Sequence, residues 1–192
     1  MLGVILCGGE SSRMGTDKGL IQFQDITWAQ LAVEKIEKLG IQVIVSINKG
    51  QKKNYEKWLS ENKLIVDDPT IALKGPAAAV LNVHLKNPAD DLFVLACDLP
   101  LMEFSVLNDL YSFYTTKNPF QAFVYSSDDE PEPLCGIYTA GALTLISNMY
   151  YTNKLEKQSM KYILDQLLVY RMPIPENKKK CFRNFNSPED VF

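Results

Sequence analysis

Strand-like and helix-like patterns alternate along almost the whole of this 192-residue chain. Short runs of branched and other apolar residues predict strands over residues 4–6, 41–48, 63–66, 91–98, 121–126 and 133–138. Capping residues and apolar residues at helical spacing predict helices over residues 28–39, 53–62, 76–85, 105–114, 141–150 and 159–168. This alternation predicts an α/β fold with three layers, α/β/α, around a mostly parallel sheet. Because no repeat or linker interrupts it, we expect a single domain spanning residues 1–192.

The net charge and the rarer residue types argue against several classes of protein. A net charge of −3 gives no sign of a surface for nucleic acid or for an anionic membrane, so we expect neither as a partner. The four cysteines are far apart and form no C-x-x-C pair, which favours reduced thiols in a cytoplasmic protein over disulfides or zinc. The single histidine argues against a Ser-His-Asp triad.

A glycine-rich segment, CGGESSRMGTDK (residues 7–18), follows the first predicted strand. The absence of side chains at Gly8, Gly9 and Gly15 allows the backbone N–H groups to approach a ligand closely. Arg13 and Lys18 place positive charge beside that backbone. The segment matches neither G-x-x-x-x-G-K-[ST] nor G-x-G-x-x-G, but its composition is suited to binding phosphate groups.

Polar residues also follow three other predicted strands: Asn48, Asp68 and Asp98. Ligands of open α/β sheets bind beyond the carboxyl ends of the strands. We therefore expect these three residues and the glycine-rich segment to line one pocket. For Asp67 and Asp68 the alternative is an Asx turn before Pro69, in which the carboxylate serves only the local backbone.

The segment LCGGESSRMGTDK resembles the L-x-G-G-x-S-x-R-M-G-x-D-K signature of the MobA-type nucleotidyltransferases, the molybdenum cofactor guanylyltransferases. Four further stretches agree with that family in the same order: DDPTIALKGP, ACDLPLM, EPLCGIY and NFNSPEDV. The resemblance spans residues 6–191 and implies a Rossmann-like nucleotidyltransferase fold. It also implies an enzyme that uses Mg²⁺ to transfer GMP from GTP to the terminal phosphate of molybdopterin, releasing pyrophosphate.

The same resemblance implies roles for individual residues. It assigns the nucleotide to the positions Leu6, Cys7, Gly8, Gly9, Lys18, Asn48, Asp68 and Asp98. Arg13 and Lys18 are implied to act on the triphosphate, and Asp98 is implied to be the Mg²⁺ ligand and the third catalytic residue. A hard cation of this kind prefers one or two carboxylates together with phosphate oxygens and water. Asn184 and Asn186, in the closing motif, are assigned to the pterin acceptor.

The implied partners are GTP, molybdopterin and the proteins that mature molybdoenzymes. Two alternatives stay open: a related transferase that uses CTP or a sugar- or alcohol-phosphate acceptor, and a non-catalytic nucleotide-binding protein. The double glycine of CGG favours guanine, and NFNSPED favours the pterin acceptor. The stretch GPAAAV stands where the family has Gly-Pro-Leu-Ala-Gly, which leaves the choice of base open. Retention of Arg13, Lys18 and Asp98 argues against the non-catalytic alternative.

Overall fold

A computed structural model describes residues 1–8, 17–116 and 119–185 of the chain. Its main sheet contains the strands β1 (Leu2–Leu6), β4 (Gln42–Ile47), β5 (Leu64–Val66), β6 (Leu92–Ala96), β7 (Ala122–Ser127), β8 (Glu130–Tyr138) and β9 (Val169–Pro173). Their order across the sheet is β5-β4-β1-β6-β8-β7-β9. Within the described residues, six of these strands run in one direction and β8 runs in the other. The prediction of a mostly parallel sheet is confirmed.

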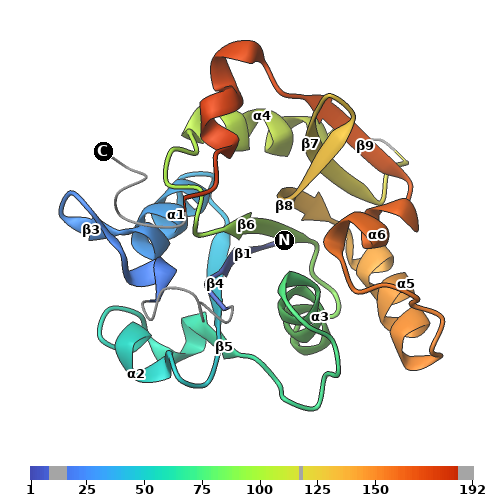
Figure 1. Ribbon diagram of the computed structural model, residues 1–192, viewed down its shortest axis with the longest axis horizontal. Helices are drawn as coiled ribbons and strands as arrows, with labels where there is room; N and C mark the ends of the chain where they lie inside the picture. The colour runs from blue at the N-terminus through green and yellow to red at the C-terminus, as the bar shows by residue number, and fades with distance from the viewer. Residues whose placement is uncertain (9–16, 117–118, 186–192) are drawn as a thin grey trace.

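Helices cover both faces of this sheet (Figure 1). They are α1 (Trp28–Glu37), α2 (Lys52–Tyr55), α3 (Pro76–Lys86), α4 (Phe104–Tyr114), α5 (Ala140–Tyr151) and α6 (Met160–Asp165). Side chains of α1 and α4 pack into one apolar core on the first face, and side chains of α3, α5 and α6 pack into a second core on the opposite face. The three-layer prediction is therefore confirmed as well.

Local sequence signals explain where the helices begin and end. Thr27 caps α1 in a capping box, because its hydroxyl accepts from the backbone of Gln30 while the Gln30 side chain accepts from the backbone of Thr27. Gly40, just beyond this helix, has a φ of 76°, a left-handed conformation that glycine adopts without strain. Pro76 occupies the first turn of α3, where its missing N–H costs nothing.

Three segments differ from the sequence prediction. The predicted helix over residues 53–62 is reduced to the four residues of α2, followed by the short 3₁₀ helix η2 (Glu61–Lys63). Strand β9 and the hairpin β2–β3 (Gln22–Phe23 and Ile26–Thr27) were not predicted. These strands are short or lie at an edge, and their mixed polar and apolar residues give no strong two-residue period.

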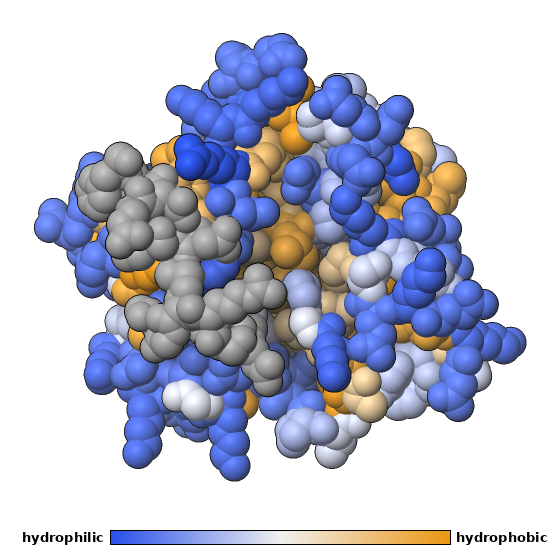
Figure 2. Space-filling view, in the orientation of Figure 1, coloured by the Kyte–Doolittle hydropathy of each residue, from blue (hydrophilic) through white to orange (hydrophobic). Residues whose placement is uncertain are grey.

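The hairpin formed by β7 and β8 rises past the end of β6. Strand β8 pairs with β6 only as far as Cys135, which lies opposite Leu95, but it continues to pair with β7 down to Glu130. Its turn is made by Asp128 and Asp129, which both have positive φ. The hairpin therefore forms a wall beside the carboxyl ends of the parallel strands. Figure 2 shows a hollow at the centre of this face, with apolar side chains at its bottom and polar side chains around it.

None of the helices in the described part of the chain is long and apolar enough to cross a membrane. Cys7, Cys97, Cys135 and Cys181 are buried free cysteines.

Candidate active site

Lys18 and Asp98 are brought together from opposite halves of the chain. Lys18 begins the 3₁₀ helix η1 (Lys18–Leu20), and Asp98 follows β6. The Lys18 ammonium lies 3.6 Å from Asp98 Oδ2, and each side chain is about a quarter exposed, at 25% and 24%. Since the glycine-rich segment leads directly into Lys18, this ion pair lies where the sequence predicted a phosphate site.

Asp98 is a partly dehydrated carboxylate. Burial raises its pKa above the ordinary value, and the nearby Lys18 ammonium opposes that rise. Its Oδ1 atom is buried and has no hydrogen-bond partner among the residues that the structure describes. A carboxylate with one oxygen unfilled fits a hard divalent cation, which would complete its coordination with phosphate oxygens and water.

Asp17 and Tyr55 fix the start of the helix that carries Lys18. Asp17 Oδ1 accepts hydrogen bonds from the backbone N–H of Gly19 at 3.0 Å and from the Tyr55 hydroxyl at 3.1 Å. Tyr55 is fully buried, and a Cβ built at Gly19 would lie only 2.1 Å from its hydroxyl oxygen. Only glycine therefore fits at this position. Asp17 belongs to the glycine-rich motif, but the sequence assigned it no role, and no sequence signal identified Tyr55.

The backbone of Leu6, Cys7 and Gly8 leads from strand β1 towards the site, but the Gly8 N–H, expected from the sequence to face a ligand, is engaged by the neighbouring strand. The N–H groups of Cys7 and Gly8 both donate to the carbonyl oxygen of Ser46, at 2.9 and 3.0 Å. On the other side, the N–H of Cys97 donates to the carbonyl oxygen of Leu6 at 3.2 Å. Neighbouring strands therefore hold these three positions in place.

Gln51, which the sequence did not single out, connects this backbone to Asn48. The Gln51 side-chain amide donates to the carbonyl oxygen of Cys7 at 2.9 Å. The Gln51 Oε1 atom accepts from the Asn48 backbone N–H at 2.8 Å, and Asn48 Oδ1 accepts from the Gln51 backbone N–H at 3.2 Å. In this structure the Asn48 side chain stabilises the turn after β4.

The two neighbouring carboxylates after β5 have different environments. Asp68 is exposed, and its Oδ1 atom accepts from the backbone and the hydroxyl of Thr70 in an Asx turn. Asp67 is half-buried, accepts from the Ser46 hydroxyl at 3.1 Å, and has its Oδ2 atom 2.9 Å from a Cβ built at Gly8. Burial raises the pKa of Asp67. The carboxylate beside the glycine-rich segment is therefore Asp67, while Asp68 forms the turn.

The chain near its carboxyl terminus returns to Asp98. The backbone N–H of Phe185 donates to the carbonyl oxygen of Asp98 at 3.0 Å. The Phe185 ring is buried and packs edge-on against Trp28 with 6.2 Å between ring centroids, whereas Asn184 is exposed. The sequence prediction that Phe185 faces the core and Asn184 does not is confirmed. Gly9, Arg13 and Asn186 lie outside the described residues.

Lys35 of α1 supports the loop that follows Asp98. Its ammonium donates to the carbonyl oxygen of Pro100 at 2.8 Å, and burial lowers the pKa of Lys35 to about 8. Between pH 8 and the ordinary pKa of a lysine, Lys35 keeps its proton in the unfolded chain but has lost it in the folded protein. The free energy of unfolding should therefore rise with pH in this window, by at most about 1.4 kcal/mol per pH unit from this group.

The variant Lys35→Met should lack this rise. Chemical denaturation at pH 7, 8, 9 and 10 should show the stability of the wild type increasing relative to that of the variant above pH 8. If the free energy of unfolding changed with pH in the same way for both proteins, the burial of a lysine ammonium at this position would be contradicted.

Known proteins resemble this chain in both sequence and fold. Residues 3–169 match the family described as the MobA-like NTP transferase domain. A Flavobacterium johnsoniae protein named probable molybdenum cofactor guanylyltransferase is 26% identical over 97% of this chain and 92% of its own length.

Solved structures share the fold. The molybdopterin-guanine dinucleotide biosynthesis protein A of Archaeoglobus fulgidus superposes with a TM-score of 0.77 at 21% identity, covering 100% of this chain and 95% of that one. A Mycobacterium tuberculosis protein solved in complex with manganese superposes with a TM-score of 0.59 at 14% identity, covering 90% and 87%. Because the family match covers most of the sequence, the chain belongs to the MobA-like NTP transferase family and is a nucleotidyltransferase.

Proposed function

We propose that this protein transfers GMP from GTP to the terminal phosphate of molybdopterin, forming the guanine dinucleotide cofactor and releasing pyrophosphate, with Mg²⁺ as its metal. One observation carries the proposal: Lys18 and the partly dehydrated carboxylate of Asp98 face each other at the carboxyl ends of β1 and β6. The names of the relatives point to the same reaction at the level of the family. Proteins that mature molybdoenzymes are the expected recipients of the product.

The chemistry needs few groups from the protein. An oxygen of the acceptor phosphate attacks the α-phosphorus of GTP, a new P–O bond forms, and pyrophosphate leaves with the electrons of the broken α–β bond. The nucleophile is already an anion, so no strong base is required, and positioning supplies much of the acceleration. Mg²⁺, when bound, offsets the negative charge of the phosphates.

Each residue then has a proposed role. Asp98 holds the metal through its unfilled oxygen, and Lys18 and Arg13 bind the triphosphate. Support for a divalent metal comes also from the manganese in the Mycobacterium tuberculosis structure. Asn184 and Asn186 contact the acceptor, since Phe185 between them joins the backbone of Asp98.

For the guanosine we propose the backbone at residues 6–9, the Asn48–Gln51 turn and Asp67. Asp67 takes the place of Asp68 in this proposal because Asp67 lies beside Gly8. Each carboxylate has its Oδ1 atom engaged, by Ser46 for Asp67 and by Thr70 for Asp68. The Oδ2 atom of the half-buried Asp67 lies beside Gly8, where it can accept a hydrogen bond from a ribose or a base.

The variants Asp67→Asn and Asp68→Asn separate the two carboxylates. Asp67→Asn should weaken GTP binding by roughly tenfold or more, the scale of a lost hydrogen bond to a charged group. Asp68→Asn should leave GTP affinity unchanged and lower the melting temperature slightly through the loosened turn. Titration of both variants with GTP checks this, and the opposite ranking would return Asp68 to the nucleotide site.

The choice of nucleotide can be tested with the wild-type protein. At a concentration of about a hundred times its Kd, a ligand stabilises the native state by about 2.7 kcal/mol. GTP with Mg²⁺ should therefore raise the melting temperature more than CTP, ATP or UTP. A larger shift with CTP would replace the guanylyl assignment with a cytidylyl one.

A further inference from the structure

The order of the strands separates the two substrates. The elements proposed for the nucleotide follow β5, β4 and β1, and Asp98 follows β6, which is the next strand of the sheet. Given the proposed function, on which this inference rests, the reacting phosphates meet at Asp98. The strand beyond β6 is β8, so the side of the hollow opposite the nucleotide is formed by the β7–β8 hairpin.

Glu132 lies in this hairpin at a break in the strand pairing. Val124 of β7 pairs with Gly136, but the next residue, Tyr125, pairs with Glu132, so residues 133–135 of β8 have no partner on β7. On the other side of the strand Cys135 stays paired with β6, so the bulge is confined to the β7 side. The Tyr138 hydroxyl stabilises the bulge by donating to the carbonyl oxygen of Pro133 at 2.7 Å. Bulges of this kind turn a side chain in a new direction and are common beside active sites.

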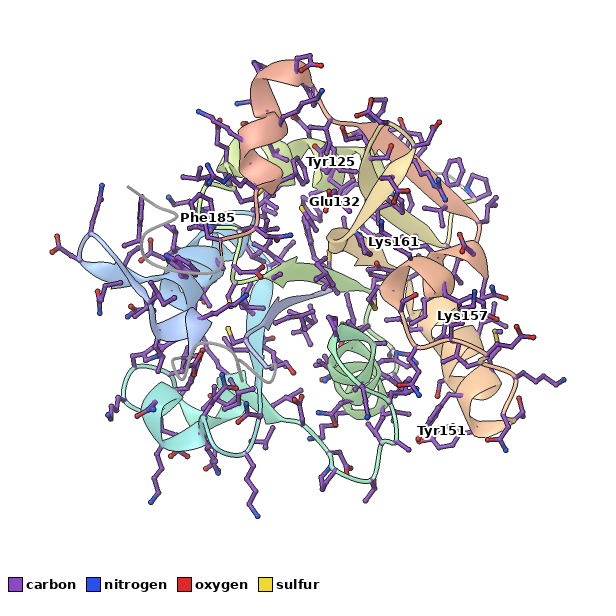
Figure 3. All side chains as sticks on the ribbon, viewed as in Figure 1. Tyr125, Glu132, Tyr151, Lys157, Lys161 and Phe185 are labelled. Atoms are coloured by element: carbon purple, nitrogen blue, oxygen red, sulfur yellow. The ribbon has the colours of Figure 1, made fainter. Side chains whose placement is uncertain are left out.

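The backbone on both sides of Glu132 is stiff. Pro131 and Pro133 flank it, and each proline fixes its own φ and removes a backbone N–H. Figure 3 shows Glu132 between Tyr125 and Lys161, at the margin of the central hollow seen in Figure 2. The backbone from which the Glu132 side chain extends is therefore fixed before any ligand binds.

Glu132 is half-buried and has neither a hydrogen bond nor an ion pair within the described residues. The ammonium of Lys161, in α6, forms an ion pair with Glu130 instead. Glu130 is exposed and lies two residues before Glu132 on β8. Burial raises the pKa of Glu132, and Lys161 lowers it only in part. Leaving a partly buried carboxylate without a donor costs free energy, which a ligand with N–H groups would recover.

We infer that Glu132 determines acceptor specificity by accepting hydrogen bonds from the N–H edge of the acceptor's ring. A 2-amino-4-oxo pyrimidine ring, the recognition edge of a pterin, places a ring N–H and an amino group side by side. Two parallel donors match the two oxygens of one carboxylate. The same negative charge repels the acceptor's phosphate, which would direct the phosphate towards the Lys18 ammonium and the ring towards β8.

The test compares Glu132→Gln with Glu130→Gln, two variants that remove the same charge from the same strand. Glu132→Gln should weaken molybdopterin binding by roughly ten- to a hundredfold, because glutamine offers one acceptor and an opposing donor. Its affinity for GTP and its melting temperature should stay near those of the wild type. Glu130→Gln should change neither affinity by more than about twofold, since an exposed ion pair contributes little.

A simple pterin without the phosphate group separates recognition of the ring from recognition of the phosphate. It should compete with molybdopterin on the wild type and on Glu130→Gln, and it should compete far more weakly on Glu132→Gln. Equal molybdopterin affinity in the two variants, or a parallel loss of GTP affinity in Glu132→Gln, would overturn the assignment of Glu132. A wild-type protein that binds GTP but not molybdopterin would overturn the proposed function and this inference with it.

Discussion

Replacing Asp98 with asparagine is expected to lower the rate of nucleotidyl transfer by at least about a hundredfold, the scale on which a lost charge-stabilising group is felt. The substitution keeps the shape of the side chain and removes its charge. It leaves the Lys18 ammonium and one neutral oxygen in the site but removes the negative charge proposed to hold the metal. The turnover number should fall, while GTP binding in the absence of metal should be retained.

The stability of this variant should not fall. The pKa of Asp98 is raised in the folded protein, so at neutral pH the buried charge destabilises the native state. The melting temperature of Asp98→Asn at pH 7 should equal or exceed that of the wild type. The difference should narrow as the pH falls through the folded-state pKa, because the wild-type carboxyl becomes neutral there. Near-normal turnover in the variant would mean that another carboxylate holds the metal.

Replacing Lys18 with methionine is expected to weaken GTP binding by roughly ten- to a hundredfold, the worth of a charge-assisted contact to phosphate. Methionine keeps the length of the apolar stem, so the packing around η1 is preserved. The pKa of Asp98 should rise further, because the positive charge that opposes its burial is gone. Isothermal titration calorimetry with GTP and with GMP checks whether the lost contact is to the triphosphate. The variant should bind GTP much more weakly than the wild type does, and its affinity for GMP should change little.

Lys63→Met is the matched control for this variant. Lys63 also forms an ion pair, at 2.8 Å with Glu37, but it lies on the outer surface away from the site. Its replacement should leave GTP affinity unchanged. Loss of the folded state in Lys18→Met would show that this lysine is structural and that the glycine-rich segment has been misinterpreted.

Much of this fold could be predicted from the sequence because its central strands and amphipathic helices have strong periodic patterns. β6, with five consecutive buried residues, and α1, with its capping box and terminal glycine, are typical cases. The antiparallel direction of β8 could not be predicted, since the direction of a strand follows from tertiary pairing. The bulge beside Glu132 could not be predicted either, because it depends on which residue of β7 faces each residue of β8.

The sequence indicated candidate residues that follow single strands, but it did not indicate contacts that join different strands. Lys18 and Asp98 could be found from the motif and from the end of β6. Which of Asp67 and Asp68 lies beside Gly8 could not be predicted, because both residues follow β5 and only the structure distinguishes their positions. Lys35 was hidden for a similar reason: its partner, Pro100, lies 65 residues away in the sequence.

The most direct test of the proposed function is to identify the product that the wild-type protein makes. Purified protein, molybdopterin and Mg²⁺ would be incubated with an equimolar mixture of GTP and CTP. The products would be separated by chromatography and identified by mass spectrometry. We expect the guanine dinucleotide of molybdopterin to accumulate with an equal amount of pyrophosphate, and Asp98→Asn to form both at least about a hundredfold more slowly. A cytosine dinucleotide as the main product, or no dinucleotide at all from a folded protein that binds GTP, would contradict the proposed function.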